Sequence, residues 1–143
     1  MRFRFLGVIA GAVMLMAAGS ALAAEKDPCL PRVPADQLAA AKGTKSPGGD
    51  AAAGKAIFEG KGTCFTCHGL SGKGDGEAGK ALDPSPRNFT NPKFQECKSD
   101  GELLWVITNG SPGTGMIPAV STGIITQDEA WKAIAYLRSL KGK

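Results

Sequence analysis

Cys64-Phe65-Thr66-Cys67-His68 is the stretch that decides how the rest of this chain folds. Its C-x-x-C-H spacing is the one that attaches a c-type haem. Two thiols three positions apart at the start of a helix can each add to one vinyl group of the porphyrin. The next residue, His68, then offers a neutral imidazole nitrogen to the iron. A C-x-x-C pair is also found in redox disulfides and in half of a zinc site, so the motif alone leaves these alternatives open.

Few residues outside the motif could act as a second ligand to the iron, and this points to one of them. His68 is the only histidine of the chain, and Met116 is the only methionine beyond the first sixteen residues. A single methionine is usually a core filler. Met116, however, stands in the glycine-rich run 113–118, 48 positions after His68, with no competing ligand. This pattern predicts His68 and Met116 as the two axial ligands, and the absence of a second histidine argues against zinc.

With these residues in view, the chain resembles the monohaem class I cytochromes c of bacterial periplasmic type, from about residue 50 to the C-terminus. The resemblance implies an all-α fold of three to four helices packed round one haem, bound covalently through Cys64 and Cys67. It also implies one-electron transfer by a soluble carrier rather than catalysis by an enzyme. The residues that carry it are Gly54, Phe58, Cys64, Cys67, His68, Met116 and Ala135-Tyr136-Leu137.

The same resemblance suggests three further cofactor-binding residues. The carbonyl of Pro86, or alternatively of Pro84, is expected to accept a hydrogen bond from the second ring nitrogen of His68. Arg87 is expected to bind a haem propionate, with a solvated surface charge as the alternative. Trp105 is expected to pack against the haem, with its indole N–H directed to a propionate.

The first 23 residues have the pattern of a secretory signal peptide. Arg2 and Arg4 precede an apolar run over 5–18, and Ala21-Leu22-Ala23 forms a cleavage signal. An uncleaved anchor is the alternative, but the run is short beside the ~20 residues of a spanning helix. We therefore expect export to the periplasm, which agrees with haem attachment outside the cytoplasm in the resembled family.

Residues 24–49 form a Pro- and Ala-rich extension that precedes the domain, residues 50–143. The stretch 34–42 predicts a short helix, and the extension is expected to cover the domain surface or to serve as a docking arm. Cys29 and Cys97 lie outside the haem motif. In an oxidising compartment they predict a disulfide, with free thiols or an intermolecular bond as the alternatives.

The domain itself shows three amphipathic stretches that predict helices over 50–59, 99–109 and 126–140. After removal of residues 1–23 the chain has 15 Lys and Arg against 13 Asp and Glu, a net charge near +2. So small a balance predicts neither nucleic-acid nor membrane binding. The expected partners are redox proteins that meet a monomer at the exposed haem edge. The alternatives are a dedicated haem subunit of an oxidoreductase complex, and a haem sensor or peroxidase-like protein in which Met116 leaves the iron.

Overall fold

Helices form every regular element in the part of the chain that this computed structural model describes, residues 27–143. The expected signal peptide, residues 1–23, lies outside the described residues. No helix between residues 27 and 143 has the length and apolarity needed to cross a membrane. The elements in chain order are α1 (Ala35–Gly43), α2 (Ala51–Glu59), α3 (Phe65–His68), the 3₁₀ helix η1 (Glu77–Gly79), α4 (Pro92–Cys97), α5 (Asp100–Asn109) and α6 (Gln127–Ser139).

Three of these helices begin where their capping residues predict. Asp50 accepts hydrogen bonds from the first backbone N–H groups of α2, at Ala52 and Ala53. Ser99 with Glu102 and Thr126 with Glu129 form complete capping boxes at α5 and α6. Each side chain satisfies an N–H group that the helix itself leaves without a partner. The predicted helices over 50–59, 99–109 and 126–140 are therefore confirmed.

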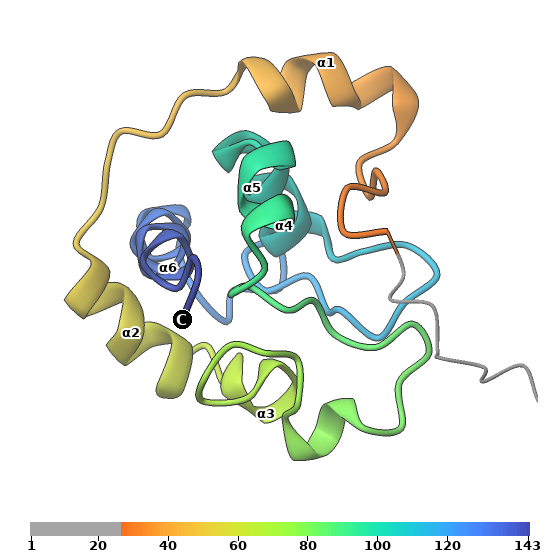
Figure 1. Cartoon of the computed structure of the whole chain (residues 1–143). Helices are drawn as coiled ribbons and strands as arrows, with labels where there is room; N and C mark the ends of the chain where they lie inside the picture. Colours follow the sequence, from red (N-terminus) through yellow and green to blue (C-terminus); the bar gives the residue numbers. More distant parts are fainter. Residues whose placement is uncertain (1–26) are drawn as a thin grey trace, which may run out of the picture.

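The crossing of α2 and α6 forms the base of the fold (Figure 1). A Cβ atom on Gly54 would lie 1.9 Å from the carbonyl oxygen of Lys132, so only glycine allows the two backbones to approach this closely. One turn later Phe58 is 1% exposed and meets the ring of Tyr136 edge-on, at 5.3 Å between centroids. The crossing of α2 and α6 therefore depends on the glycine at position 54.

The helix α4, Pro92–Cys97, is not among the stretches that the sequence predicts as helical. Asn91 caps it by accepting from the backbone N–H groups of Lys93 and Phe94, and Pro92 occupies its first turn. Proline is tolerated there because that position needs no intrahelical hydrogen bond. Phe94 is buried in the main core together with Phe58 and Phe89.

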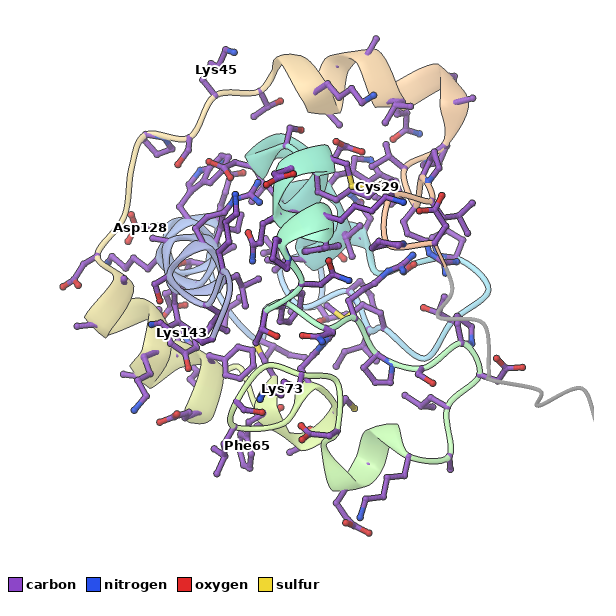
Figure 2. The ribbon with its side chains drawn as sticks, viewed as in Figure 1. Cys29, Lys45, Phe65, Lys73, Asp128 and Lys143 are labelled. Atoms are coloured by element: carbon purple, nitrogen blue, oxygen red, sulfur yellow. A yellow bond between two sulfur atoms is a disulfide. The ribbon has the colours of Figure 1, made fainter. Side chains whose placement is uncertain are left out.

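The extension lies against the domain rather than apart from it (Figure 1). Its helix α1 packs on α5, where a Cβ on Gly101 would come within 1.9 Å of the Ala41 carbonyl oxygen. The structure joins Cys29 to Cys97 in a disulfide, with their Cα atoms 5.6 Å apart. Figure 2 shows Cys29 beside the central helices, whereas Lys45, further along the extension, points outward. The extension is thereby attached to both α4 and α5.

Candidate haem-binding site

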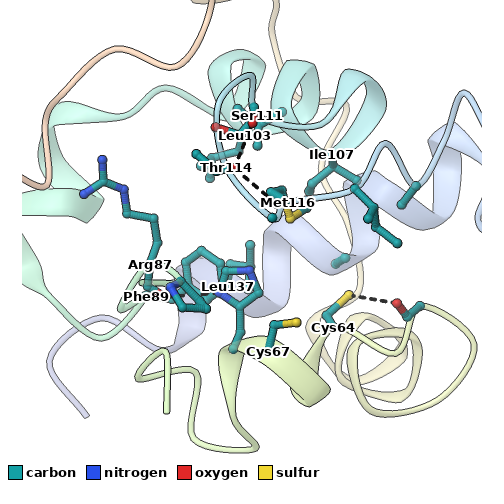
Figure 3. Close-up of a pocket in the computed structure, with 18 of the residues that line it drawn as sticks. Cys64, Cys67, Arg87, Phe89, Leu103, Ile107, Ser111, Thr114, Met116 and Leu137 are labelled. Atoms are coloured by element: carbon teal, nitrogen blue, oxygen red, sulfur yellow. Dashed lines mark hydrogen bonds between the residues drawn. The ribbon is translucent and has the colours of Figure 1, made fainter. Parts of the chain in front are cut away.

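A largely apolar cavity of about 220 Å³ brings together all the residues that the sequence singled out as haem-binding except Trp105. Cys64, Cys67 and His68 line it from α3 and the residue before it, and Met116 lines it from the loop after α5. Figure 3 shows the sulfur of Met116 facing the same space as the two cysteine sulfurs. Core residues of several elements complete the wall, including Phe58, Phe89, Leu103, Ile107, Ala133 and Leu137.

The motif helix α3 is held by a glycine-rich loop that folds against its outer side. A Cβ on Gly76 would lie 2.4 Å from the carbonyl oxygen of Thr66, and one on Gly79 would lie 2.4 Å from that of Cys67. The backbone N–H of Gly76 donates to the Cys67 carbonyl oxygen at 3.1 Å. These close approaches explain the small residues after the motif, since any side chain would push the loop away and leave α3 unsupported.

His68 is fixed in one orientation by two contacts. Its Nδ1 lies 3.1 Å from the carbonyl oxygen of Arg87, and its ring stacks on Phe89 at 4.5 Å between centroids. Burial lowers the pKa of His68 to about 4, against a smaller opposing effect of the Arg87 carbonyl. The imidazole is therefore neutral at pH 7, with Nδ1 as the donor and Nε2 left as the nitrogen that can bind a metal.

The carbonyl that orients His68 is a correction to the sequence-based expectation. The partner is Arg87, one residue beyond Pro86 and three beyond Pro84. Pro86 lines the cavity, but its carbonyl oxygen lies against the backbone of Gly74 instead of His68. A Cβ on Gly74 would be only 2.4 Å from this oxygen. Successive groups along an extended chain point to opposite sides, so a shift of one residue changes which carbonyl faces the ring. The sequence therefore identified the segment 84–87 that contacts His68, but not which carbonyl of this segment faces the ring.

The two motif cysteines are free thiols in the structure. Burial, as the largest effect, raises the pKa of Cys64 to about 11. Redox-active C-x-x-C pairs depend on a lowered thiol pKa, so this environment does not suit thiol–disulfide exchange. Across residues 27–143, no group of three or more His, Cys, Asp or Glu residues is placed to hold a metal ion. The donor set instead fits a haem: two thiols, one neutral imidazole and one thioether around an apolar space.

The loop that carries Met116 is shaped by its own hydrogen bonds. The N–H of Ser111 donates to the Met116 carbonyl oxygen, and the N–H of Met116 donates to Oγ1 of Thr114. Gly110 has a φ of 77° and lies so close to the Met116 carbonyl that a Cβ would come within 2.8 Å. The loop therefore returns on itself directly after α5 and keeps Met116 at the cavity wall.

Of the remaining predicted site residues, Arg87 lies at the cavity and Trp105 does not. Arg87 lines the cavity, and its Nη1 donates to the carbonyl oxygen of Asp27 at 3.1 Å. Trp105 is absent from the cavity wall, and its indole N–H donates to Oε1 of Gln37 in α1 at 2.8 Å. The expected packing of Trp105 against a haem is therefore corrected, because the extension covers the face of α5 on which this side chain lies.

Among the cavity residues that the sequence analysis did not single out are two cationic ones, Arg32 of the extension and Lys98 directly after α4. A signal for both was present. Arg32 lies three positions after Cys29, and Lys98 directly follows Cys97. A disulfide between Cys29 and Cys97 brings the segments that carry Arg32 and Lys98 close together. Phe89, which stacks on His68, had no such signal, because its register depends on the path of the loop before α4.

Comparison with known proteins agrees with this site. Residues 51–141 match the family described as Cytochrome c, which is more than half of the chain. The chain belongs to the cytochrome c family. Membership implies a covalently bound c-type haem and confirms the resemblance seen in the sequence. None of the curated proteins matches this chain.

Two solved structures are similar to this cytochrome c domain. One is a chain of the reducing HAO-like protein complex Kustc0457/Kustc0458 of Kuenenia stuttgartiensis, with 33% identity and a TM-score of 0.54. That similarity covers 64% of this chain and 43% of the other, so it spans less than half of the relative's length. The other is the KustC0563 c-type cytochrome, with 26% identity, a TM-score of 0.47, and coverage of 62% of this chain and 96% of that one.

Proposed function

We propose that this protein transfers single electrons through one haem, attached at Cys64 and Cys67 and ligated by His68 and Met116. The observation that carries the proposal is the meeting of these four side chains at one apolar cavity. They come from segments about 50 residues apart in the sequence, and His68 is the only histidine available. Between residues 27 and 143, no group of three or more His, Cys, Asp or Glu residues offers a competing metal site.

The roles of the residues follow from their chemistry. When bound, the haem supplies an iron that alternates between the ferrous and ferric states. Neutral His68, oriented by the Arg87 carbonyl, offers Nε2 on one side. Met116 offers a thioether on the other, a soft ligand that favours the ferrous state and raises the reduction potential. The apolar wall excludes water and disfavours the additional charge of the ferric state, in the same direction.

A carrier fits this ligand set better than an enzyme does. If His68 and Met116 both bind the iron, no position would remain there for a substrate. Ile117, next to Met116, is 55% exposed and lines the cavity, so an apolar contact for a redox partner lies beside the site. A small, transient interface is expected for such partners. The signal-peptide pattern over 1–23 and the Cys29–Cys97 bridge support an oxidising, periplasmic location.

A second candidate function is that of a dedicated haem subunit in an oxidoreductase complex. The 33% identity to a chain of a reducing HAO-like complex favours it. Both functions use the same electron transfer and differ in whether the partner stays bound. Size-exclusion chromatography and affinity isolation from the native source separate them: a carrier elutes alone as a monomer, and a subunit elutes with its complex.

The test of the shared chemistry is a pyridine haemochrome assay and an intact-mass measurement on protein made with the haem-attachment machinery. We expect one haem per chain that survives denaturation, and its loss in the Cys64→Ala/Cys67→Ala variant. Cys29→Ser is the matched control, because it removes a cysteine outside the motif and should keep the haem. A wild-type protein without covalent haem contradicts the proposal.

A further inference from the structure

One end of the otherwise apolar cavity is cationic. Arg32, Arg87 and Lys98 line it from three separate segments: the extension, the loop before α4 and the end of α4. The charge of Lys98 is balanced within the fold, because its Nζ lies 3.4 Å from Oε1 of Glu102 and both side chains are almost fully buried. For Arg32, by contrast, the described chain provides neither a hydrogen bond nor an ion pair.

The two arginines at this end act on each other. Both side chains line the cavity, and their positive charges are close enough to repel each other, while the carboxylate of Asp27 attracts Arg87. Like charges beside a low-polarity space destabilise each other unless an anion lies between them. Two guanidinium groups together offer a forked set of donors that matches carboxylates. The cationic end therefore has the chemistry of a carboxylate-binding site.

The position of this end relative to the motif cysteines is suited to a haem. Figure 3 shows Arg87 on the opposite side of the cavity from Cys64. In a haem the two vinyl groups and the two propionates are carried by opposite halves of the porphyrin. A haem attached through Cys64 and Cys67 would direct its propionates away from these cysteines, toward the arginines.

Arg32 is held at the cavity by contacts on both sides of it in the sequence. Cys29 is bonded to Cys97, and the Nζ of Lys98 donates to the carbonyl oxygens of Cys29 and Leu30 at 2.9 and 3.0 Å. Val33, directly after Arg32, is 5% exposed. The backbone of Arg32 is thus fixed between a disulfide-anchored segment and a core residue, which reduces the entropy cost of binding an anion.

We propose that Arg32, from a segment outside the cytochrome c match at 51–141, binds a haem propionate together with Arg87. The inference rests on the proposed function, since it requires the haem to be present. Its consequence is that the extension completes the cofactor site of the domain. Arg32 neutralises a propionate and so removes a negative charge that would stabilise the ferric state. The reduction potential should therefore be higher with Arg32 than without it.

The test compares three variants of the haem-loaded full-length protein: Arg32→Gln, Arg32→Lys and the control Lys45→Gln. Lys45 carries the same charge on the same extension, but it is exposed, points outward (Figure 2) and does not line the cavity. We expect Arg32→Gln to shift the reduction equilibrium toward the ferric state by on the order of tenfold, or 59 mV for one electron. Arg32→Lys should recover part of this shift, and Lys45→Gln should leave the wild-type value.

A second readout separates propionate binding from a merely structural role. The propionate methylene resonances in proton NMR spectra should move in Arg32→Gln and stay in place in Lys45→Gln. If Arg32→Gln lowers only the melting temperature, or leaves both potential and resonances at wild-type values, the inference about Arg32 is wrong. If the wild-type protein itself carries no covalent haem, the proposed function fails first, and the haemochrome assay reports that separately.

Discussion

At the scale of single residues, the site depends on the environment of His68 more than on its identity. An exposed histidine would be partly protonated near pH 6.5, and a protonated ring cannot bind a metal. Burial, the stack on Phe89 and the Arg87 carbonyl together keep Nε2 unprotonated and aimed in one direction. His68 therefore has the protonation state and orientation of a metal ligand in the absence of a metal.

The lowered pKa of His68 is that of the ring before iron binds it, and iron binding would favour the neutral ring further, so both effects predict resistance to acid. Because the folded-state pKa of about 4 lies below the unfolded value of 6.5, the unfolded chain binds the proton more strongly in this window. The contribution of His68 to stability is present above pH 6.5 and is lost as the pH falls through about 4. We expect the low-spin absorption spectrum to persist at pH 5. Loss of that spectrum with a midpoint near 6.5 would contradict the buried, neutral ring.

Met116 allows the second residue-scale prediction. Met116→Ala should keep the covalent haem, since the thioether cysteines are unchanged, but should open one axial position. We expect the ferrous variant to bind carbon monoxide readily and the potential to fall by more than about 60 mV, a tenfold change in the reduction equilibrium. Ile117→Ala is the control, because it shortens the adjacent exposed side chain without removing a ligand. Ready carbon monoxide binding by the wild-type protein would instead favour the sensor or peroxidase-like alternative.

At the scale of elements, the crossing of α2 and α6 sets the distance between the parts of the cavity wall. Both helices contribute to that wall, through Phe58 on α2 and through Ala133 and Leu137 on α6. The closest approach is at Gly54, which has no side chain to separate the backbones. A small change at this glycine should therefore reach the haem site through helix displacement.

Gly54→Ala tests this packing. The new Cβ would lie 1.9 Å from the Lys132 carbonyl oxygen and 3.0 Å from the Cβ of Tyr136, so one helix must move. We expect a loss of about 3 kcal/mol in the free energy of unfolding, measured by denaturant titration. Gly43→Ala is the control, since Gly43 is also a helical glycine, the last residue of α1, but a Cβ added there would have no atom within 4 Å. Equal effects of the two substitutions would show that the helix crossing does not depend on Gly54.

At the scale of the whole molecule, the extension and the domain form one structure. The disulfide joins Cys29 to Cys97 across 68 positions, α1 packs on α5 at Gly101, and Trp105 donates to Gln37. The extension was expected to cover the surface or to serve as a docking arm. The structure has it packed over α5 and at the cavity, so that part of the cavity wall comes from outside the family match.

The Cys29–Cys97 bridge gives a prediction at this scale. A loop of this length is expected to contribute about 4 kcal/mol by restricting the unfolded chain. Cys29→Ser, Cys97→Ser and the double variant should therefore lose similar amounts of stability in thermal or denaturant unfolding, because either single change breaks the same bond. Additive losses in the double variant would show that the two residues stabilise the fold independently.

The sequence by itself determined the local chemistry of this protein. The sequence contains the attachment motif, a single candidate for each axial ligand, and the helix caps at Asp50, Ser99 and Thr126. It also contains the two further cysteines, Cys29 and Cys97, whose bond the structure shows. These features depend on residue identity and short spacing. Capping is a contact within one turn, and a ligand set is limited by how many suitable side chains the chain contains.

Only the tertiary structure decided which backbone and side-chain groups face the cavity. Four contacts depend on the path of the loops. His68 donates to the carbonyl of Arg87 rather than that of Pro86, and Phe89 stacks on His68. Trp105 donates to Gln37, and Arg32 lines the cavity. A loop has no fixed period that relates residue number to direction, so the sequence alone does not tell which of its groups face the cavity. The direction of each group is set by long-range packing. Here the extension is held against the domain by a disulfide between residues 68 positions apart in the sequence.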